Sequence, residues 1–297
     1  MSFTIANTLD DALTALAAGA RPIAGGTDLV VGARHGKAPL PADLVAIDRI
    51  AELKGVTETA DGISIGALVT HHDIETHPLL TTVYAGLADG SALVGSPATR
   101  HIGTLGGNIM NGSPAMDTGA PLAVMCAEVE LRSLRGSRRV PIEQLWTGPG
   151  RTAAEPDELC VAIHIPAPAA RANSAYLRLE YRRAMEIAVV GAAAYVALAD
   201  DGTVAALCVG LTAVGPKIFT GDLQGQIGRP VAEAAQRAAE LSMEQATPIS
   251  DVRASDRYRR HTVGVMARRA VEAAARRAGG EAISTPVNRA LGIGAAS

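Results

Sequence analysis

The chain has 297 residues and a formal net charge of −3, so it is long enough for two domains and gives no electrostatic basis for binding nucleic acid. Hydrophobic residues make up 48% and charged residues 19%, which indicates a globular rather than a disordered protein. Aromatic residues are only 3%, too few for a base-stacking platform. The core must therefore be built from Ala, Val, Leu and Ile.

The cysteines and the apolar runs indicate which metal sites and which cellular compartment are expected. Cys126, Cys160 and Cys208 stand far apart and form no CxxC pair, so the sequence encodes neither a zinc knuckle nor an iron–sulfur cluster. Their odd, sparse count fits a reducing cytoplasm. Residues 1–19 lack a basic region followed by an apolar run, so no signal peptide is expected. No apolar run approaches 18 residues, so no membrane span is expected.

The first part of the chain alternates strand and helix patterns. Leu9, Leu13 and Leu16 share one helical face, and Gly19 ends that helix. The β–loop–α–β order predicts an α/β unit. Its later elements are a brief strand within 21–26, one or two helical turns within 28–36 and an apolar strand within 42–48.

A second unit begins at residue 55 with an alternating, hairpin-like stretch. Thr70 and Asp73 have the spacing of a capping box, which predicts a helix start. Residues 95–120 are rich in Gly and Asn, and we expect a long loop there. The other expected elements are a helix within 79–94, a helix from about Pro121 to Cys126, and strands within 128–134 and 157–166, and the segment 138–146 belongs to the same unit.

Residues 166–175, "PAPAARANSA", are the best candidate for a linker between domains. Beyond them, residues 188–214 read as a strand hairpin that turns at Asp200–Gly202. Helices are expected within 230–243 and 259–278. The second has an apolar stripe with Arg on its other face, typical of a packed surface helix and less often of a partner-binding face. We expect the tail, 279–297, to be mobile.

Two glycine loops are the strongest chemical signal in the chain. "AGGTD" spans 24–28 and "TLGGN" spans 104–108. A glycine pair lets successive N–H groups point into one space and form a nest for anions. Two nests that face each other would hold a pyrophosphate, although each alone is equally compatible with a tight turn. GxGxxG, GxxxxGK[ST] and GxSxG are all absent, so a Rossmann site, a P-loop and a nucleophile elbow are not indicated.

Taken together, three segments resemble a known family. "PIAGGTDLVVGARHG", "GSPATRHIGTLGGNIMNGSPAMDTGAPL" and "YLRLEYRRAMEIAVVGAAAYVAL" are similar to the FAD-binding medium subunit of the molybdenum hydroxylases, the xanthine dehydrogenase and carbon monoxide dehydrogenase group. The resemblance covers nearly the whole chain, including "LWTGPGRT" and "YRRHTVGVMARRA". Each motif alone is weak, but the three in this order and spacing are specific.

The resemblance implies an α+β fold. Residues 1–168 would form an FAD-binding domain of the vanillyl-alcohol-oxidase type, with α/β subdomains at about 1–54 and 55–168. Residues 169–297 would form a C-terminal domain with a three-stranded antiparallel sheet and helices. The linker candidate at 166–175 agrees with this boundary.

The resemblance also implies where FAD binds. The diphosphate and its neighbouring sugars would lie between the two glycine loops. One wall would be formed by Ala24, Gly25, Gly26, Thr27, Asp28 and Leu29, and the other by Thr104, Leu105, Gly106, Gly107 and Asn108, with Ser113 a further contact. Asp117 matches an acid that binds cofactor hydroxyls, and its alternative role is a helix N-cap.

Other cofactor contacts are implied less directly. Val94 takes a position near the flavin, and Arg178 matches a basic residue near the cofactor. Ile187, with Glu186 before it, matches the stretch beside the isoalloxazine ring. Cys160 lies on a strand where the family has an apolar residue touching the cofactor, and as a lone thiol it suits packing better than redox chemistry.

The implied function is electron transfer within a complex. A large molybdopterin subunit would hydroxylate the substrate, a small subunit with two [2Fe–2S] clusters would relay electrons, and FAD in this chain would pass them to NAD or another acceptor. No side chain is assigned as a catalytic acid or base. Metal binding by His71, His72 and His77 is disfavoured, because "HHDIETH" is not HExxH. His101 would lie near phosphate or at the surface.

Two alternatives stay open at this point. The chain could be a stand-alone FAD-dependent oxidase or reductase, although no extra substrate domain is visible. It could also be a binding module whose loops have lost the cofactor, which the intact residues Thr104–Asn108 and Asp117 argue against. The sequence identifies neither the substrate of the complex nor its electron acceptor.

Overall fold

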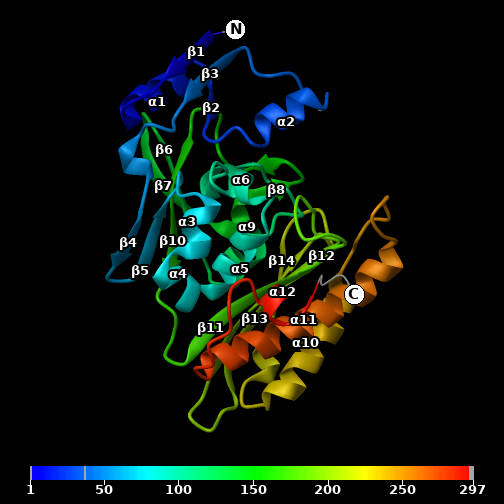
Figure 1. Ribbon diagram of the computed structural model, residues 1–297. Helices are drawn as coiled ribbons and strands as arrows, with labels where there is room; N and C mark the ends of the chain where they lie inside the picture. Colours follow the sequence, from blue (N-terminus) through cyan, green and yellow to red (C-terminus); the bar gives the residue numbers. More distant parts are fainter. Residues whose placement is uncertain (1, 37, 294–297) are drawn as a thin grey trace.

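The computed structural model describes residues 2–36 and 38–293 (Figure 1). The first subdomain is a three-stranded parallel sheet with the strand order β1-β3-β2. Helix α1 packs Leu9, Leu13 and Leu16 into a small core with Val45, as the sequence predicts. Its elements are β1 (Ser2–Ile5), α1 (Leu9–Ala17), β2 (Arg21–Ile23), α2 (Leu29–Arg34), β3 (Asp43–Ala46) and the 3-10 turn η1 (Ala51–Leu53).

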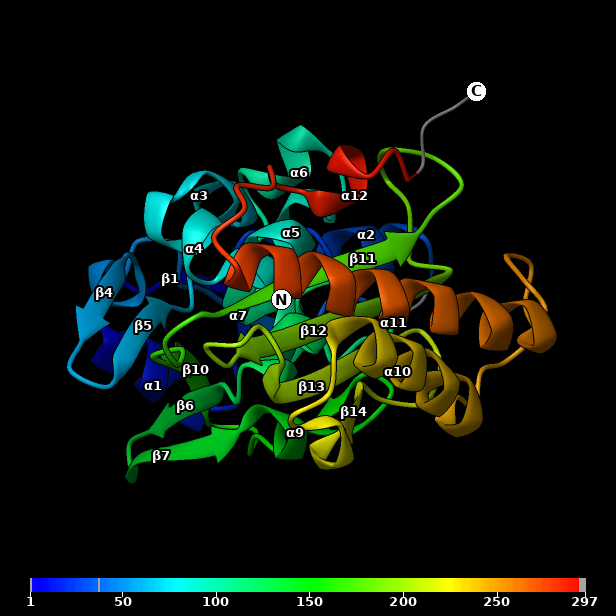
Figure 2. The same ribbon diagram turned by 90° about the horizontal axis from the view of Figure 1, so that it is seen from below.

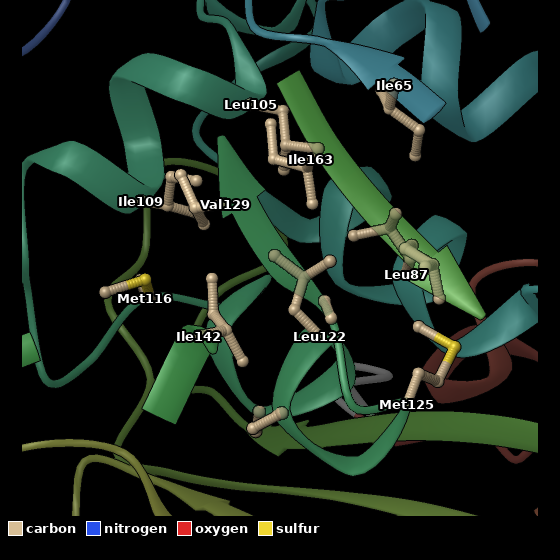
Figure 3. Close-up of a cluster of buried hydrophobic side chains, with 14 of the residues drawn as sticks. Ile65, Leu87, Leu105, Ile109, Met116, Leu122, Met125, Val129, Ile142 and Ile163 are labelled. Carbon is tan, nitrogen blue, oxygen red and sulfur yellow. The ribbon is translucent and has the colours of Figure 1, made fainter. Parts of the chain in front are cut away.

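The second subdomain is built on a five-stranded antiparallel sheet with the order β4-β5-β10-β6-β7. Figure 3 shows its apolar core, where Ile65, Val129 and Ile163 of the sheet meet Leu87 and Leu122 of the helices. The strands are β4 (Val56–Thr59), β5 (Gly62–Gly66), β6 (Glu128–Ser133), β7 (Gly136–Pro141) and β10 (Leu159–Pro166), with a separate pair β8 (Trp146–Gly148) and β9 (Arg151–Thr152). The helices are α3 (His71–Thr76), α4 (Pro78–Thr82), α5 (Ala85–Leu93), α6 (Pro97–Arg100), α7 (Leu105–Met110), α8 (Gly119–Val124) and α9 (Ile142–Leu145).

The expectation of a long loop over 95–120 is wrong in part, because α6 and α7 lie inside it. Local capping explains both helices. The Ser96 side chain accepts a hydrogen bond from Thr99 N, and Pro97 occupies the first turn of α6. Thr104 caps α7 in the same way by accepting from Gly107 N. Two short capped turns thus form where overall composition favours a loop.

The C-terminal domain is a sheet between two apolar cores. Its order is β11-β12-β13-β14, so it contains one short strand more than the three implied by the family resemblance. Helices α10 and α11 cover one face, as Figure 2 shows, and the other face packs against α8 of the second subdomain. The elements are β11 (Ala172–Leu179), β12 (Val190–Leu198), β13 (Val204–Thr212), β14 (Phe219–Asp222), η2 (Gln224–Gln226), α10 (Val231–Gln245), α11 (Asp256–Ala278) and α12 (Val287–Ala290).

Two boundaries differ from expectation. The connection between domains is shorter than 166–175, because β10 runs to Pro166 and β11 begins at Ala172. The tail is not uniformly mobile: Val287 and Asn288 of α12 are fully buried against the rest of the protein. Residues 294–297 of the tail lie outside the described residues. Both differences arise because tertiary packing orders segments that have weak local signals.

A buried ion pair joins the two domains. Asp89, fully buried on α5, accepts hydrogen bonds from Arg277 Nη1 at 2.6 Å and Arg277 Nη2 at 3.0 Å. It also accepts from the backbone N–H of Tyr176 at 3.1 Å and of Val287 at 2.8 Å. Because every donor comes from the C-terminal domain, this carboxylate ties α5 to β11, α11 and α12.

Arg277→Met should therefore lower the free energy of unfolding by about 3–5 kcal/mol, since it leaves the Asp89 carboxylate buried without its cationic partner. Urea titration followed by circular dichroism measures this. The matched control is Arg276→Met, which removes an exposed ion pair with Glu281 and should leave the unfolding midpoint nearly unchanged. Equal midpoint shifts in the two variants would refute the assigned role of Asp89.

Candidate functional site

The first glycine loop is in direct contact with the segment that leads into the second. A Cβ placed on Gly25 would lie 2.0 Å from the carbonyl oxygen of Ile102. Gly26 follows with φ +68°, a left-handed conformation that favours glycine. The fold therefore brings these two distant stretches close together.

Residues 67–71 hold the second loop in place. Leu105 N donates to Val69 O, Gly106 N donates to Ala67 O, and His71 N donates to Gly103 O. Thr70 and Thr104 form an isolated antiparallel bridge beside these bonds. The loop is thus fixed by backbone pairing to a segment that also begins α3.

The glycine pair of the second loop has two different roles. Gly106 is buried, and a Cβ there would lie 2.7 Å from Ala67 Cβ, so this glycine serves packing. Gly107 is exposed, and a Cβ there would meet within 4 Å only the Thr104 hydroxyl, at 3.0 Å. The backbone of Gly107 is consequently open to a ligand from outside. Glycine at both positions is what close backbone approach on two sides requires.

The first loop presents its polar side chains at the same place. A Cβ on Gly103 would lie 3.5 Å from the Thr27 hydroxyl and 3.4 Å from Cδ2 of His71. Asp28 is exposed and Leu29, which starts α2, is half-buried. Ala24 is half-buried and packs against the core of the first subdomain. The residues predicted as the first wall therefore border the second loop.

The predicted acid Asp117 lies in a buried cluster. Its Oδ1 accepts from the Tyr176 hydroxyl at 2.8 Å, and its Oδ2 accepts from Arg178 Nη1 at 2.6 Å. Burial raises the pKa of the Asp117 carboxyl, and the Arg178 guanidinium opposes that rise. The alternative role as a helix N-cap is wrong, because Thr118 occupies that position before α8.

Arg178 connects this cluster to the loop that carries Ile187. The guanidinium is fully buried and donates from Nε to Glu180 Oε2 at 2.8 Å and from Nη1 to the Glu186 carbonyl at 3.2 Å. On the other side, Thr118 donates its hydroxyl proton to Asn108 Oδ1 at 2.6 Å. A continuous path thus runs from the second glycine loop through Asp117 and Arg178 to the residues beside Ile187.

The remaining predicted contacts differ in exposure. Ile187 is 46% exposed, and Val94 is half-buried at the end of α5, where its carbonyl accepts from Arg100 Nη1 at 3.2 Å. Met185 N donates to Gly95 O at 2.9 Å, which brings the Ile187 loop next to Val94. Ser113 is half-buried and its hydroxyl accepts from Ala115 N.

Cys160 lies in the core and is 4% exposed. Burial raises the pKa of its thiol to about 12, so it stays protonated at neutral pH. A neutral, enclosed thiol acts as an apolar side chain, in agreement with the packing interpretation.

The histidines have separate environments. His71 is 1% exposed, and burial, reinforced by the charge of Arg100, lowers its pKa to about 4. His101 is exposed and stacks on His72 with ring centroids 3.8 Å apart, so it lies at the surface. Within residues 2–36 and 38–293, no group of three or more His, Cys, Asp or Glu side chains is placed to hold a metal ion.

A large crevice of about 1170 Å³ lies elsewhere, between the five-stranded sheet and the C-terminal sheet. Its lining includes Ile63, Tyr84, Cys126, Tyr195 and Cys208. None of the predicted cofactor contacts borders it, so the crevice is distinct from the glycine-loop site.

Comparison with protein families matches this architecture along most of the chain. Residues 1–168 match the FAD-binding domain of molybdopterin dehydrogenases, and residues 175–274 match the C-terminal domain of the carbon monoxide dehydrogenase flavoprotein. The chain belongs to this family. The matched ranges divide it where the connection between β10 and β11 lies.

Individual relatives agree over nearly their full length. A xanthine dehydrogenase FAD-binding subunit of Escherichia coli O157:H7 is 31% identical over 287 residues, which cover 94% of this chain and 98% of the relative. The carbon monoxide dehydrogenase medium chain of Afipia carboxidovorans is 34% identical over 269 residues, covering 90% and 92%. In carbon monoxide dehydrogenase from Hydrogenophaga pseudoflava, a chain superposes with a TM-score of 0.88 at 29% identity, covering 93% and 98%.

These matches confirm the predicted family, the α+β fold and FAD as the family's cofactor. The chain is an oxidoreductase subunit of the molybdenum-dependent dehydrogenase type. The exposed backbone of Gly107, where a Cβ would meet only the Thr104 hydroxyl, leaves room for a cofactor beside the second loop. In the described ranges, no helix is both long and apolar enough to cross a bilayer.

Sequence reasoning missed three residues of the site region. His71 was considered only as a metal ligand, yet it lies behind Gly103. Tyr176 and Thr118 bond to the predicted residues Asp117 and Asn108. For His71 the available signal was the Thr70–Asp73 capping box, which places it on the first turn of a helix. The other two contacts are long-range and have no local signal.

The low pKa of His71 predicts a specific pH dependence of stability. The unfolded chain takes up a proton near pH 6.5 and the folded chain only near pH 4, so stability is retained above pH 6.5 and lost as the pH falls toward 4. His71→Gln should remove about 3 kcal/mol of this loss, given 1.36 kcal/mol per pKa unit. Urea unfolding at pH 7.5 and pH 4.5 gives the change in the free energy of unfolding with pH for the wild type and for His71→Gln. The same change in both proteins would contradict a buried, neutral His71.

Proposed function

We propose that this chain takes electrons from the [2Fe–2S] clusters of a small partner subunit and passes them, through FAD, to an external acceptor. The hydroxylation itself would occur in a large molybdopterin subunit. The observation that carries the proposal is the contact of the first glycine loop with the segment that leads into the second, in a chain of this family. Relatives of matching length are FAD-binding or medium subunits of larger dehydrogenases, which supports a role within a complex.

The glycine loops are proposed to bind the diphosphate. The N–H groups near Gly25 would donate to phosphate oxygens, and the absence of Cβ atoms at Gly25 and Gly107 lets the backbone of both loops approach the diphosphate. Thr27 and Asn108 would add side-chain hydrogen bonds. Ala24, Gly26, Asp28, Leu29, Thr104, Leu105 and Gly106 complete the two proposed walls, with Ser113 beyond them.

For Asp117 and Arg178 we propose mainly a role in positioning the flavin site. Both carboxylate oxygens of Asp117 already have protein partners, so any cofactor hydroxyl would use its remaining lone pairs. Arg178 holds the Glu186 carbonyl and so fixes the start of the segment proposed to lie beside the flavin. Val94 and Ile187 would provide apolar contacts there, and Cys160 would support the site from the core.

FAD supplies the redox chemistry when it is bound, because it accepts electrons singly and releases them in pairs. The protein's own residues position and shield it, and no side chain is required as an acid or base. The external acceptor would approach at the exposed loop around Met185 and Ile187, which are 56% and 46% exposed. NAD is one candidate acceptor, and the Glu186 side chain, which accepts from Ile187 N at 3.1 Å, borders that approach. A location in the cytoplasm is proposed because none of the three cysteines takes part in a disulfide.

Gly107→Val tests the diphosphate site. The branched side chain should fill the open space beside the Gly107 backbone, keep the diphosphate away from the second loop, and weaken FAD binding by about tenfold to a hundredfold, the effect of losing one contact to a charged group. Fluorescence titration of apoprotein with FAD measures the affinity. Gly32→Ala on α2, where a Cβ meets nothing within 4 Å, is the matched control. Undiminished FAD affinity in Gly107→Val would contradict the assignment.

Electron transfer is tested on the native complex. Purification through a tag on this chain should recover two further subunits that contain molybdenum and iron with acid-labile sulfide. Substrate reduction of the complex should bleach the flavin absorbance, and addition of acceptor should restore it. A chain that purifies alone and turns over a substrate at full rate would instead support a stand-alone flavin oxidase or reductase.

A further inference from the structure

His71 occupies the meeting point of the two glycine loops without taking part in the metal chemistry its sequence context suggests. It is the first helical residue of α3, and its backbone N–H donates to the Gly103 carbonyl at 3.1 Å. Its side chain is 1% exposed. The ring is therefore held between α3 and the second loop and cannot turn out to solvent.

The two edges of the imidazole face different neighbours. Nδ1 lies 3.5 Å from the hydroxyl of Ser91, a fully buried residue of α5. On the opposite edge, Cδ2 is 3.4 Å from where a Gly103 Cβ would be. Among the described residues, Nε2 has no hydrogen-bond partner. One ring nitrogen is thus engaged, and the other is bonded to the Cδ2 that faces Gly103.

The Thr27 hydroxyl faces the same point from the first loop. It is 3.5 Å from the position of a Gly103 Cβ, so Gly103 leaves both groups room that any larger residue would fill. Within the part of the chain that the structure describes, this hydroxyl has no hydrogen-bond partner. A hydroxyl can accept one hydrogen bond while donating another, which a backbone amide cannot do.

We propose that His71 is a positioning residue in the cofactor-bound protein: its Nε2–H would donate to the Thr27 oxygen, a bond that the unliganded chain does not make, and would thereby direct the Thr27 hydroxyl proton to the cofactor diphosphate. Ser91 would donate to Nδ1 and so fix the tautomer that carries the proton on Nε2. The order is Ser91 to His71, His71 to Thr27, and Thr27 to phosphate. Ser91 and Nε2 each donate once, Nδ1 accepts once, and the Thr27 hydroxyl accepts once and donates once. The inference rests on the proposed FAD site and adds a residue of this chain to it.

The surroundings of His71 keep this Ser91–His71–Thr27 hydrogen-bond relay neutral. Burial and the nearby Arg100 guanidinium hold the pKa of His71 at about 4, so at neutral pH the ring has one N–H and one lone pair. A cationic ring would have to donate from both nitrogens and could not accept from Ser91. Hydrogen bonds between neutral buried groups contribute modestly, so the expected effect on FAD affinity is about fivefold.

Amide variants separate the two edges of the ring. Gln at position 71 places an amide near the former Nε2, and Asn places one near the former Nδ1. His71→Asn should weaken FAD binding about fivefold, and His71→Gln should recover most of the loss. His72→Asn alters the neighbouring, partly exposed imidazole and should leave the affinity unchanged. A role confined to packing against Ser91 predicts the reverse order, with Asn better than Gln, and that order would overturn the proposal.

A double-mutant cycle tests the link to Thr27. Thr27→Val should cost about as much as His71→Asn, Thr27→Ser should be neutral, and the His71→Asn/Thr27→Val double variant should bind no worse than either single variant. Additive losses would show that the two residues act independently and would overturn the proposal. Thermal unfolding of each apoprotein checks folding, and the Thr27 series keeps the test decisive if His71→Asn does not fold.

Nitrogen-15 NMR of the wild-type protein with FAD bound reads the tautomer without any substitution. A proton on Nε2 of His71 is expected, and a proton on Nδ1 would overturn the proposal. The outcome also separates this inference from the function on which it rests. Wild-type apoprotein that binds no FAD would remove both, whereas wild type that binds FAD with independent His71 and Thr27 removes only the relay.

Discussion

The site depends on one close backbone approach, the contact of Gly25 with the carbonyl group of Ile102. Any side chain at Gly25 would push the two loops apart, because a Cβ would overlap the carbonyl oxygen. The second loop cannot yield, since residues 67–71 hold it through backbone hydrogen bonds. The first loop is less constrained, because α2, which follows it, buries none of its residues. The geometry is thus set by the second loop, and the first loop rests on it.

Buried charge organises the region behind the loops. Arg178, Asp117 and Glu180 share one enclosed cluster, with Tyr176 and the Glu186 carbonyl as further partners. Such a cluster costs desolvation free energy, and removing one member leaves the others uncompensated. Its value here is positional, since it joins the strand β11 to the segment after the second glycine loop. In the proposed flavin environment, Arg178 holds Asp117 and the Glu186 carbonyl, and Thr118, next to Asp117 in the chain, bonds Asn108.

Local patterns predicted much of this fold from sequence. The Leu9, Leu13 and Leu16 periodicity, the Thr70–Asp73 capping box and the Asp200–Gly202 turn each specify an element through contacts within a few residues. The failures share the opposite property. Helices α6 and α7 are too short to show a periodicity, and α12 is ordered by long-range contacts with Asp89 and Arg178. The glycine loops were identified from their sequence motifs, but the position of His71 behind Gly103 depends on tertiary structure that no local pattern encodes.

The origin of Asp89's partners bears on how the protein is made. This carboxylate belongs to the FAD-binding domain, yet its donors lie at positions 176, 277 and 287. During synthesis from the N-terminus, the FAD-binding domain emerges long before Arg277, and its central helix then carries a charge that has no counterion to bury against. The final packing of that helix therefore needs residues 277 and 287, which are translated late, so this domain reaches its complete buried core only when almost the whole polypeptide has been made.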